Sequence, residues 1–428
     1  MKNYLIKLPK AFLGDRKNMY INKKTISKGL ISYIFALILI EPAALRYFDF
    51  TNRIFTIAQS VLLLIVLYLQ FFNVNKRVII RKRSGESSRV VILLIIYYAY
   101  FLVNTYIQNG RTMSILTQAI QFIGFAIFID IILKNNPNTL FKTILNILTV
   151  YVVANCFCVL LMPNGLYTTS YYSNNYLLGY DNQNINFILP ALLLVLLKNV
   201  YYKSCKLHIL LVYAAAWITA IKIWSGMTLV VVTLMTLLGV LSLKKKKGYF
   251  HKYIFTDKIF NSFTLLVTNI AAFVAIVIFQ LQVYFEYIIV NILQRNLTLT
   301  SRTIIWERNI QYIKASPIFG YGREVYTTRA VKIGFVESSP AGLHAHNRFL
   351  EVMYCGGVVL LGLYIYILVY SAKKLTEVKT TFYAKILSFG IFVYMFGMLT
   401  EYYDYCIFFW AFLVMAENAK HVCAERKE

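Results

Sequence analysis

The chain has 428 residues, of which 59% are hydrophobic and only 14% are charged, and this excludes an ordinary water-soluble domain. Lysine and arginine outnumber aspartate and glutamate by 44 to 18, an excess that in a soluble protein would suggest nucleic-acid binding. Here the basic residues gather in alternate loops between apolar runs, which is the positive-inside pattern of membrane proteins and argues against nucleic acid as a partner. The six cysteines show neither metal-ligand nor disulfide-framework spacing.

Runs of about twenty apolar residues match the hydrocarbon thickness of a bilayer and predict transmembrane helices. About twelve such helices are expected, so the predicted fold class is an all-α, polytopic integral membrane protein. The runs are centred near residues 30–47, 54–73, 90–107, 112–133, 142–162, 183–199, 207–223, 226–243, 261–283, 347–370, 385–400 and 404–418.

The basic loops fall on one side of the membrane if both chain ends are cytoplasmic, and this orientation divides the chain into five segments. They are a basic cytoplasmic segment (1–28), transmembrane helices 1 to 9 (29–283), a long extracytoplasmic catalytic loop (284–346), helices 10 to 12 (347–419) and a cytoplasmic tail (420–428). The first apolar run is long and has no small-residue cleavage site, so it is expected to remain as an anchor.

Two short segments are predicted to face the same side as the long loop. Residues 163–183 are rich in Asn and Tyr and contain no Lys or Arg. They form either a sugar-binding surface of amides and aromatic faces or an ordinary interfacial loop. Lys222, in the turn 222–226, either supplies positive charge to a site or extends its side chain to the membrane interface.

The loop 284–346 is the one long hydrophilic insert. A short amphipathic helix is predicted from a cap at Thr300 or Ser301 to about Ala315, with Trp306 on its apolar face. Such a helix is expected to lie on the membrane surface. The proline and glycines of 317–322 then end it and force turns.

The same loop carries positive charge on the side where topology does not require it, so an anionic ligand is expected. The basic residues are Arg295, Arg302, Arg308, Lys314, Arg323, Arg329 and Lys332. A planar guanidinium binds phosphate through two hydrogen bonds and stays charged, which favours Arg302, Arg323 and Arg348 as contacts for a phosphorylated substrate. The alternative for Arg348 is an ion pair with Glu351, three residues further along a helix.

His344 and His346 are the two histidines predicted to lie outside the cytoplasm. A neutral imidazole accepts a proton near neutral pH, so His346 is the predicted catalytic base. Asn347 is a natural helix cap, which places Glu351 one turn inside as a further catalytic candidate beside Arg302. The alternatives are that the histidines only cap and pack the loop, or that they bind a metal with Glu351 as third ligand. No metal or other cofactor is expected.

Motifs for nucleotide-driven chemistry are missing from the sequence: there is no Walker A, G-x-G-x-x-G, D-x-D or nucleophilic serine elbow. An enzyme outside the cytoplasm would therefore need a substrate that is already activated. Charged residues within the apolar runs are few and lie mostly at their edges, which argues against an ion-coupled transporter.

In their order and topology, several short motifs resemble those of the bacterial O-antigen ligase and O-antigen or capsular polysaccharide polymerase family. They are Trp224-Ser225-Gly226, Ser301-Arg302 with Trp306, Pro317 to Gly322, His346-Asn347 with Leu350-Glu351, and Gly356-Gly357, within about residues 209–369. The resemblance implies a polytopic, metal-independent glycosyltransferase in which His346 and arginines such as Arg302 matter for activity. Many relatives have Arg after the serine of the first motif, whereas this chain has Gly226, and Lys222 is hypothesised to supply that charge.

The expected function is therefore a polymerase of capsule, exopolysaccharide or O-antigen that joins undecaprenyl-pyrophosphate-linked repeat units at the outer face of the bacterial cytoplasmic membrane. Expected partners are that lipid-linked oligosaccharide, the lipid bilayer, and flippase and chain-length regulator proteins. The candidate catalytic residues are His346, Arg302 and Glu351, and the candidate substrate-binding residues are Arg323, Arg348, His344, Lys222, Trp306 and Asn347. The alternatives are an O-antigen ligase acting on a lipid A core, a lipid-linked oligosaccharide flippase or other transporter, and a structural or sensing membrane protein.

Overall fold

The structure is a computed structural model that describes residues 23–71, 88–169, 174–202, 206–243, 256–287, 291, 302–334, 344–401 and 406–424. Within these ranges the chain is helical, and its β-structure is limited to two isolated bridges, Tyr167 with Asn175 and Tyr176 with Gly179. The predicted all-α fold class is therefore confirmed for the described residues.

The helices have the following bounds. They are α1 (Lys23–Leu39), α2 (Ala43–Tyr47), α3 (Asp49–Phe71), α4 (Arg89–Ile107), α5 (Thr112–Asn135), α6 (Pro137–Leu161), η2 (Asp181–Asn184), α7 (Ile185–Tyr202), α8 (Lys206–Ile223), α9 (Gly226–Leu243), α11 (Ser262–Phe273), η3 (Val274–Ile278), η4 (Leu281–Phe285), α12 (Arg302–Ala315), α13 (Tyr326–Ile333), α14 (Arg348–Thr376), α15 (Phe382–Gly397), α16 (Ile407–Glu417) and α17 (Ala419–Ala424).

Among the described residues, seven helices are long and apolar enough to cross a membrane, so the chain is a multi-pass membrane protein. They are Asp49–Tyr68, Arg89–Ile107, Thr112–Asn135, Pro137–Leu161, Asp181–Val200, Lys206–Ile223 and Arg348–Thr376. Shorter apolar helices occupy the remaining predicted spans: Leu30–Leu39, Gly226–Ser242, Ser262–Ile278, Phe382–Gly397 and Ile407–Glu417. The count of twelve membrane crossings stays a prediction.

The first predicted span is not one continuous helix. It is interrupted after Leu39, and the chain resumes as α2 at Ala43. Pro42 explains the break, because proline has no N–H to donate and disfavours helical geometry in the residue before it. The break leaves Glu41 buried at the junction, and the N–H of Ala44 donates to the carbonyl of Leu177 at 3.1 Å.

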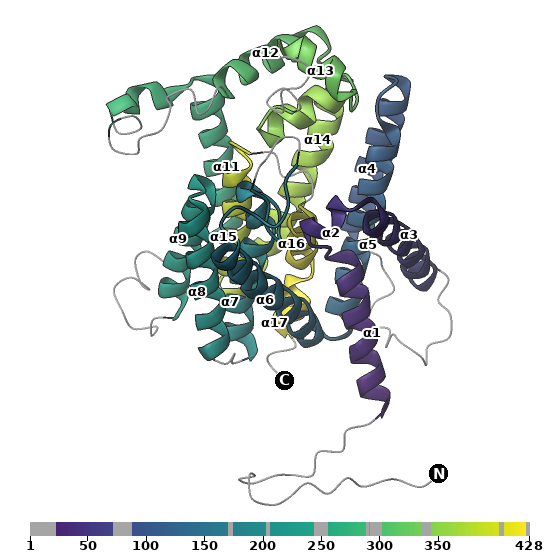
Figure 1. The fold of residues 1–428 in the computed structure, drawn as a ribbon, viewed down its shortest axis with the longest axis vertical. Coiled ribbons are helices and arrows are strands. Elements are labelled where there is room, and N and C mark those ends of the chain that lie inside the picture. The colour runs from purple at the N-terminus through teal and green to yellow at the C-terminus, as the bar shows by residue number, and fades with distance from the viewer. Residues whose placement is uncertain are drawn as a thin grey trace, which may run out of the picture.

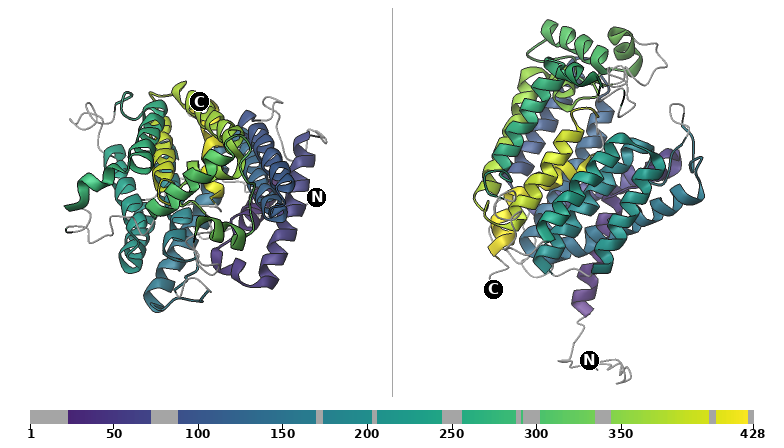
Figure 2. Two further views of the ribbon diagram at one scale, coloured as in Figure 1. Left: turned by 90° about the horizontal axis from the view of Figure 1, so that it is seen from above. Right: turned by 90° about the vertical axis from the view of Figure 1, so that its left-hand side faces the viewer.

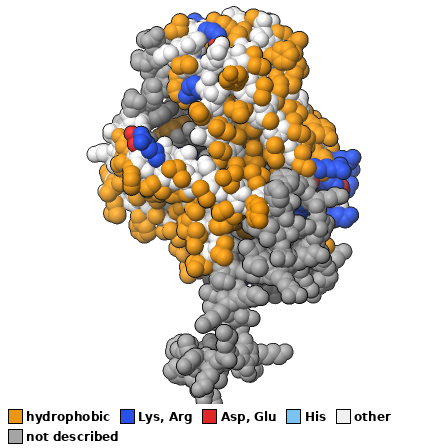
Figure 3. Space-filling model, turned by 90° about the vertical axis from the view of Figure 1, so that its right-hand side faces the viewer, with side chains coloured by type: hydrophobic (Ala, Val, Ile, Leu, Met, Phe, Trp, Pro, Cys, Tyr) orange, Lys and Arg blue, Asp and Glu red, His pale blue; other side chains and the backbone are white. Residues whose placement is uncertain are grey.

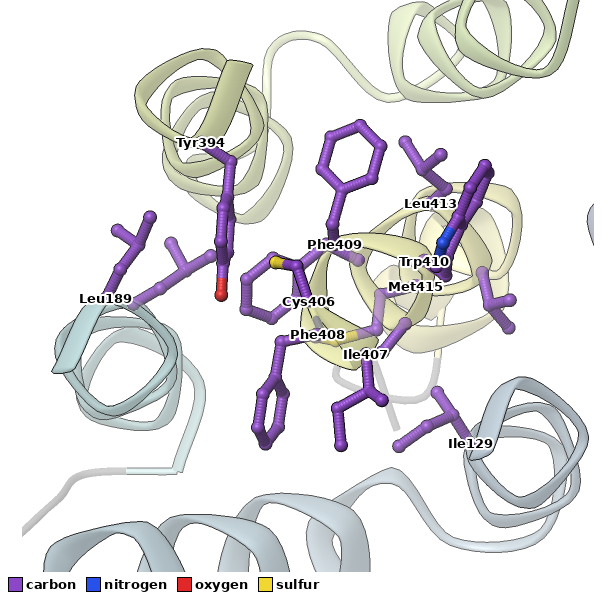
Figure 4. Close-up of a cluster of buried hydrophobic side chains, with 14 of the residues drawn as sticks. Ile129, Leu189, Tyr394, Cys406, Ile407, Phe408, Phe409, Trp410, Leu413 and Met415 are labelled. Atoms are coloured by element: carbon purple, nitrogen blue, oxygen red, sulfur yellow. The ribbon is translucent and has the colours of Figure 1, made fainter. Parts of the chain in front are cut away.

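The helices enclose a continuous apolar core centred on α16. Figure 4 shows Phe408, Phe409 and Trp410 pointing from α16 in different directions, with Ile129, Leu189 and Tyr394 of neighbouring helices around it. A helix that is apolar on every face is typical of a protein core or a membrane span, and the residues Ile407 to Ala416 of α16 are buried.

Helices α12 and α13 lie across one end of the bundle, and the first turn of α1 and α17 lie toward the opposite end (Figures 1 and 2). The side of the molecule that carries α3 and α4 is mainly hydrophobic, with charged side chains gathered in a few places (Figure 3). Exposed apolar side chains on α3, including Ile57 and Leu64, contribute to this surface, as expected for a face that contacts lipid.

The long loop contains the predicted helix, α12, and a second helix, α13, that the sequence analysis did not predict. The apolar face of α12 is turned onto the protein, since Ile305 and Trp306 are buried and Trp306 packs with Val277 and Leu350. Ser301, one of the two expected caps, lies outside the described residues, as do 288–290, 292–300 and 335–343.

Candidate active site

A polar cluster forms around the carboxylate of Glu401, just beyond the end of α15. Arg302, the first residue of α12, makes an ion pair with Glu401 Oε1, and Asn182 of η2 donates its Nδ2–H to the same oxygen at 2.8 Å. His346 Nδ1 lies 3.8 Å from Glu401 Oε2. Ser225 Oγ, between α8 and α9, donates to Asn182 Oδ1 at 2.9 Å. We call Glu401, Arg302, His346, Asn182 and Ser225 the Glu401 cluster.

The members of the Glu401 cluster come from five segments that are far apart in sequence, and they remain partly open to solvent. The exposed fraction is 19% for the side chain of Arg302, 17% for His346 and 7% for Glu401. Asp181 lies close enough to interact electrostatically with both Glu401 and Arg302. The structure thus brings together two predicted catalytic residues, His346 and Arg302, around a carboxylate that the sequence analysis did not select.

His346 is held in an unusual backbone conformation. Its φ is +48°, in the left-handed region that few residues other than glycine adopt. Its N–H donates to Nδ1 of His344 at 3.3 Å, and the two ring centroids are 4.1 Å apart. His346 Nδ1 is buried and has no hydrogen-bond partner among the described residues. Backbone strain and an unsatisfied ring nitrogen are features that occur at functional sites, where the surrounding structure maintains them.

Residues on both sides of His346 fix its position. Asn347 caps α14 as predicted, because its Oδ1 accepts from the N–H of Leu350 at 3.0 Å, while its Nδ2 donates to Leu399 O at 2.9 Å. Trp306 is fully buried and donates its indole N–H to the carbonyl of Ala345 at 3.0 Å. The polar groups of Asn347 and Trp306 thus form hydrogen bonds within the protein. Their contact with substrate stays a prediction.

Glu351, the third predicted catalytic residue, lies outside the Glu401 cluster. Both of its oxygens accept from the guanidinium of Arg329 at 2.7 Å, and Oε2 also accepts from the N–H of Ala345 at 2.8 Å. Burial alone would lower the pKa of Arg329, but the adjoining carboxylate raises it, so the pair remains charged. The partner that the structure gives to Glu351 is thus Arg329 of α13, whereas the sequence analysis had offered Arg348 as the alternative.

Arg348 and Arg323 are buried away from Arg302. Arg348 NH2 donates to the hydroxyl of Tyr97 at 3.5 Å, and its guanidinium lies 5.6 Å from the ring centre of Tyr364. Arg323 NH1 donates to Gln118 Oε1 at 2.8 Å. These contacts of the two arginines are with protein groups, and pyrophosphate contacts by Arg323 and Arg348 stay predictions.

The turn 317–322 fits into a break in α14. Gly357 has φ +61° and ψ −162°, so the helix cannot continue regularly there, and nearby carbonyls need other donors. The N–H of Tyr321 donates to Tyr354 O at 2.9 Å, and that of Gly322 donates to Cys355 O at 2.8 Å. A Cβ atom on Gly357 would lie 2.0 Å from Ile318 O, so only glycine fits. Together with the Glu351–Arg329 pair, this interlock forms what we call the α14 anchor.

Two predicted residues remain to be placed. Lys222 is exposed in the last turn of α8, three residues before Ser225. His344 is half-buried. Its contact with substrate stays a prediction. Among the described residues no group of three or more His, Cys, Asp and Glu side chains lies close enough to hold a metal ion.

The sequence analysis missed Glu401 and Asn182. Glu401 carried a weak signal, as one of the few acidic residues at the end of an apolar run, and Asn182 belongs to the Asn-rich segment 163–183. Neither signal identifies a partner, because the contacts join residues 219 positions apart.

The fold and the Glu401 cluster define a polytopic helical membrane protein with a partly open polar site at one end of its bundle. Residues 191–365 match a family model described as O-antigen ligase. Part of the chain is also 35% identical over 78 residues to an exopolysaccharide production protein, ExoQ, of Rhizobium meliloti (strain 1021), an alignment that covers 17% of this chain and 18% of that relative. No solved structure matches the chain.

Both matches agree with the resemblance that the sequence motifs predicted, and they support a role in polysaccharide biosynthesis. The family-matched segment contains Ser225, Arg302 and His346 of the Glu401 cluster and all of the α14 anchor. Glu401 and Asn182 lie outside it on either side.

Proposed function

We propose that this protein is a polysaccharide polymerase that joins undecaprenyl-pyrophosphate-linked repeat units at the outer face of the cytoplasmic membrane. In this proposal the chain crosses the membrane twelve times, both termini are cytoplasmic, and the Glu401 cluster faces outward. The charge on α14 supports this orientation, because the helix begins at the end that carries α12 and finishes with Lys373 and Lys374 in its last turn.

The observation that carries the proposal is the sharing of one carboxylate by His346 and Arg302. In the reaction, a hydroxyl of the acceptor repeat unit attacks the anomeric carbon of the donor glycan. The bond from that carbon to the pyrophosphate oxygen breaks, a glycosidic C–O bond forms, and the lipid pyrophosphate leaves with the electron pair. His346 takes the hydroxyl proton, and Arg302 stabilises the negative charge that develops on the leaving group.

Glu401 gives this arrangement a resting state and an active state. Without substrate, Glu401 neutralises Arg302 through their ion pair. An incoming pyrophosphate competes for the guanidinium because it offers more negative charge and several acceptor oxygens. Glu401, once released, then pairs with the imidazolium of His346 as it receives the proton. Binding of the donor therefore does two things at once. It places Arg302 on the pyrophosphate, and it frees Glu401 to stabilise protonated His346.

O-antigen ligase is the second candidate, because the family model that matches residues 191–365 carries that description. The same residues would then transfer the glycan to a lipid A core instead of a second lipid-linked repeat unit. The two candidates share the donor and the chemistry and differ only in the acceptor, so the acceptor that supports turnover distinguishes them.

His346→Ala tests the proposal. In lipid vesicles that contain the full chain and lipid-linked repeat units, we expect the rate of polymer formation to fall by about 10²- to 10⁴-fold, the typical contribution of a general base. His421→Ala, in α17 at the other end of the bundle, is the matched control and is expected to retain full activity. Unchanged polymer length and rate in correctly inserted His346→Ala protein would contradict the assignment.

A further inference from the structure

A cavity of about 310 Å³ lies beside η2, between α2, residues of 167–169 and 175–180, the start of α7 and α16. Its volume is at the lower end of the range of roughly 300–1,000 Å³ that is typical of small-molecule sites. No motif of the family resemblance falls in it, and neither the Glu401 cluster nor the α14 anchor includes any of its lining residues.

Two buried polar atoms at the cavity lack hydrogen-bond partners among the described residues. One is Oε1 of Glu41, whose other oxygen accepts from Arg46 Nε at 3.2 Å. The other is Oδ1 of Asn186. A side-chain hydrogen bond also joins Gln59 to the Glu41 carboxylate, and the Gln59 amide donates to Ile38 O at 3.0 Å, so Oε1 is the oxygen of Glu41 that lacks a donor. Buried acceptors without donors are costly, so a ligand that brings hydroxyl groups would be stabilised here.

Aromatic rings supply the rest of the lining. The rings of Tyr47 and Tyr167 are in contact, with centroids 4.6 Å apart, and Tyr180 and Phe187 also border the cavity. Burial raises the pKa of Tyr167, so its hydroxyl stays neutral and can both donate and accept a hydrogen bond. Aromatic faces beside fixed carboxylate and amide oxygens suit a sugar ring, which has apolar C–H faces and a rim of hydroxyls.

The backbone of η2 connects this cavity with the Glu401 cluster. Tyr180 and Gln183 line the cavity, whereas Asn182 between them contacts Glu401. Consecutive Cα atoms are about 3.8 Å apart, so the cavity and the Glu401 cluster border the same single turn. Asn184 holds this turn in place, because it accepts from Asn155 of α6 at 2.7 Å and donates to Tyr180 O at 2.9 Å.

We propose that the cavity is a subsite for the terminal hexopyranose of the acceptor repeat unit, an inference that rests on the proposed polymerase function. The terminal sugar of the acceptor is the end of a glycan and can be enclosed in a small cavity. The donor glycan grows with each transfer and needs an open path. Glu41 and Asn186 accept hydrogen bonds from the sugar hydroxyls, and the cavity thereby presents the attacking hydroxyl toward His346.

Steady-state kinetics of the full chain in lipid vesicles, with donor saturating and acceptor varied, test this subsite. Glu41→Gln and Asn186→Leu are each expected to raise KM for the acceptor by about three- to tenfold while kcat and the KM for the donor stay within twofold of wild type. Gln121→Leu is the matched control, since Gln121 of α5 is also a buried amide with an unpaired atom but does not line the cavity.

Binding separates this inference from the proposed function. The probe is the repeat-unit oligosaccharide freed from its lipid by mild acid, followed by saturation-transfer NMR on His346→Ala protein, with and without Glu41→Gln or Asn186→Leu. Binding that is kept in His346→Ala and weakened by either second substitution supports the subsite, even if no polymer is made and the polymerase proposal fails. Polymer formation that needs His346, with acceptor KM and probe binding unchanged in both cavity variants, overturns the subsite and leaves the polymerase standing.

Discussion

The Glu401 cluster and the α14 anchor lie at the same end of the bundle, and both contain charged residues of the long loop, but they satisfy those charges differently. In the anchor, Glu351 and Arg329 match one to one through two short hydrogen bonds, and both side chains are buried. In the cluster, one carboxylate serves Arg302, Asn182 and His346 at once, and the ring nitrogen of His346 that faces it is left without a hydrogen bond.

This difference distinguishes residues that stabilise the fold around the site from residues that are available to bind and act on a substrate. A buried pair joined by two matched hydrogen bonds cannot bind a ligand through those atoms without losing its own contacts, so it is suited to holding the chain in place. A carboxylate that is shared between partly exposed partners, Arg302 and His346, can exchange them at a smaller cost, which a site that binds a charged substrate requires. Residue type does not distinguish the two, because each contains an arginine and a glutamate.

Glu351→Ala should produce the largest change in stability. It leaves the buried guanidinium of Arg329 without a counterion, and breaking such a pair typically costs about 3–5 kcal/mol. We expect little folded protein by size-exclusion chromatography in detergent, and a lower unfolding temperature for what remains. The double variant Arg329→Met with Glu351→Leu should recover much of the loss, because neither charge then remains buried. A well-folded Glu351→Ala protein that lacks only activity would instead make Glu351 catalytic, as the sequence first predicted.

Glu401→Gln should have the opposite profile, with folding intact and transfer slowed by roughly 10- to 100-fold, because the substituted amide cannot stabilise the imidazolium of His346. The unfolding temperature is expected to stay close to that of wild type, since the Arg302 side chain retains access to solvent. Glu324→Gln is a suitable control, because Glu324 also pairs with a basic residue of the long loop, Lys332, but lies outside the cluster. Equal loss of activity in both variants would show that the effect of Glu401→Gln is not specific to the Glu401 cluster.

Local signals in the sequence predicted the parts of this site that depend on local structure. The span of α12 and the cap at Asn347 are examples, because helix periodicity and capping involve residues only a few positions apart. The break after Leu39 was also present in the sequence as Glu41-Pro42, but the length of the apolar run outweighed it. Helix α13 was missed because its eight residues, which include Thr, Arg and Lys, contain no apolar run.

Partnerships across the fold could not be predicted in this way. Arg348 is the nearer basic residue to Glu351 in sequence, yet Arg329 is the residue that pairs with it. Likewise Arg302 and Glu401 are 99 positions apart, and only the packing of α12 over the bundle brings them together. The positions of charged residues in the sequence therefore predict that an anion site exists better than they predict which residues form it.

Lys222→Ala gives the smallest expected change and decides whether the Glu401 cluster extends to the end of α8. An exposed lysine contributes no more than about 1 kcal/mol to binding a charged group, so KM for the lipid-linked donor should rise less than about fivefold. Because salt screens exposed charges, the difference from wild type should shrink as ionic strength is raised from 0.01 M to about 0.15 M, where the screening length falls to about 8 Å. Lys314→Ala, an exposed lysine of α12 outside the cluster, is the matched control. Equal donor KM in the two variants at low salt would confine the anion site to Arg302.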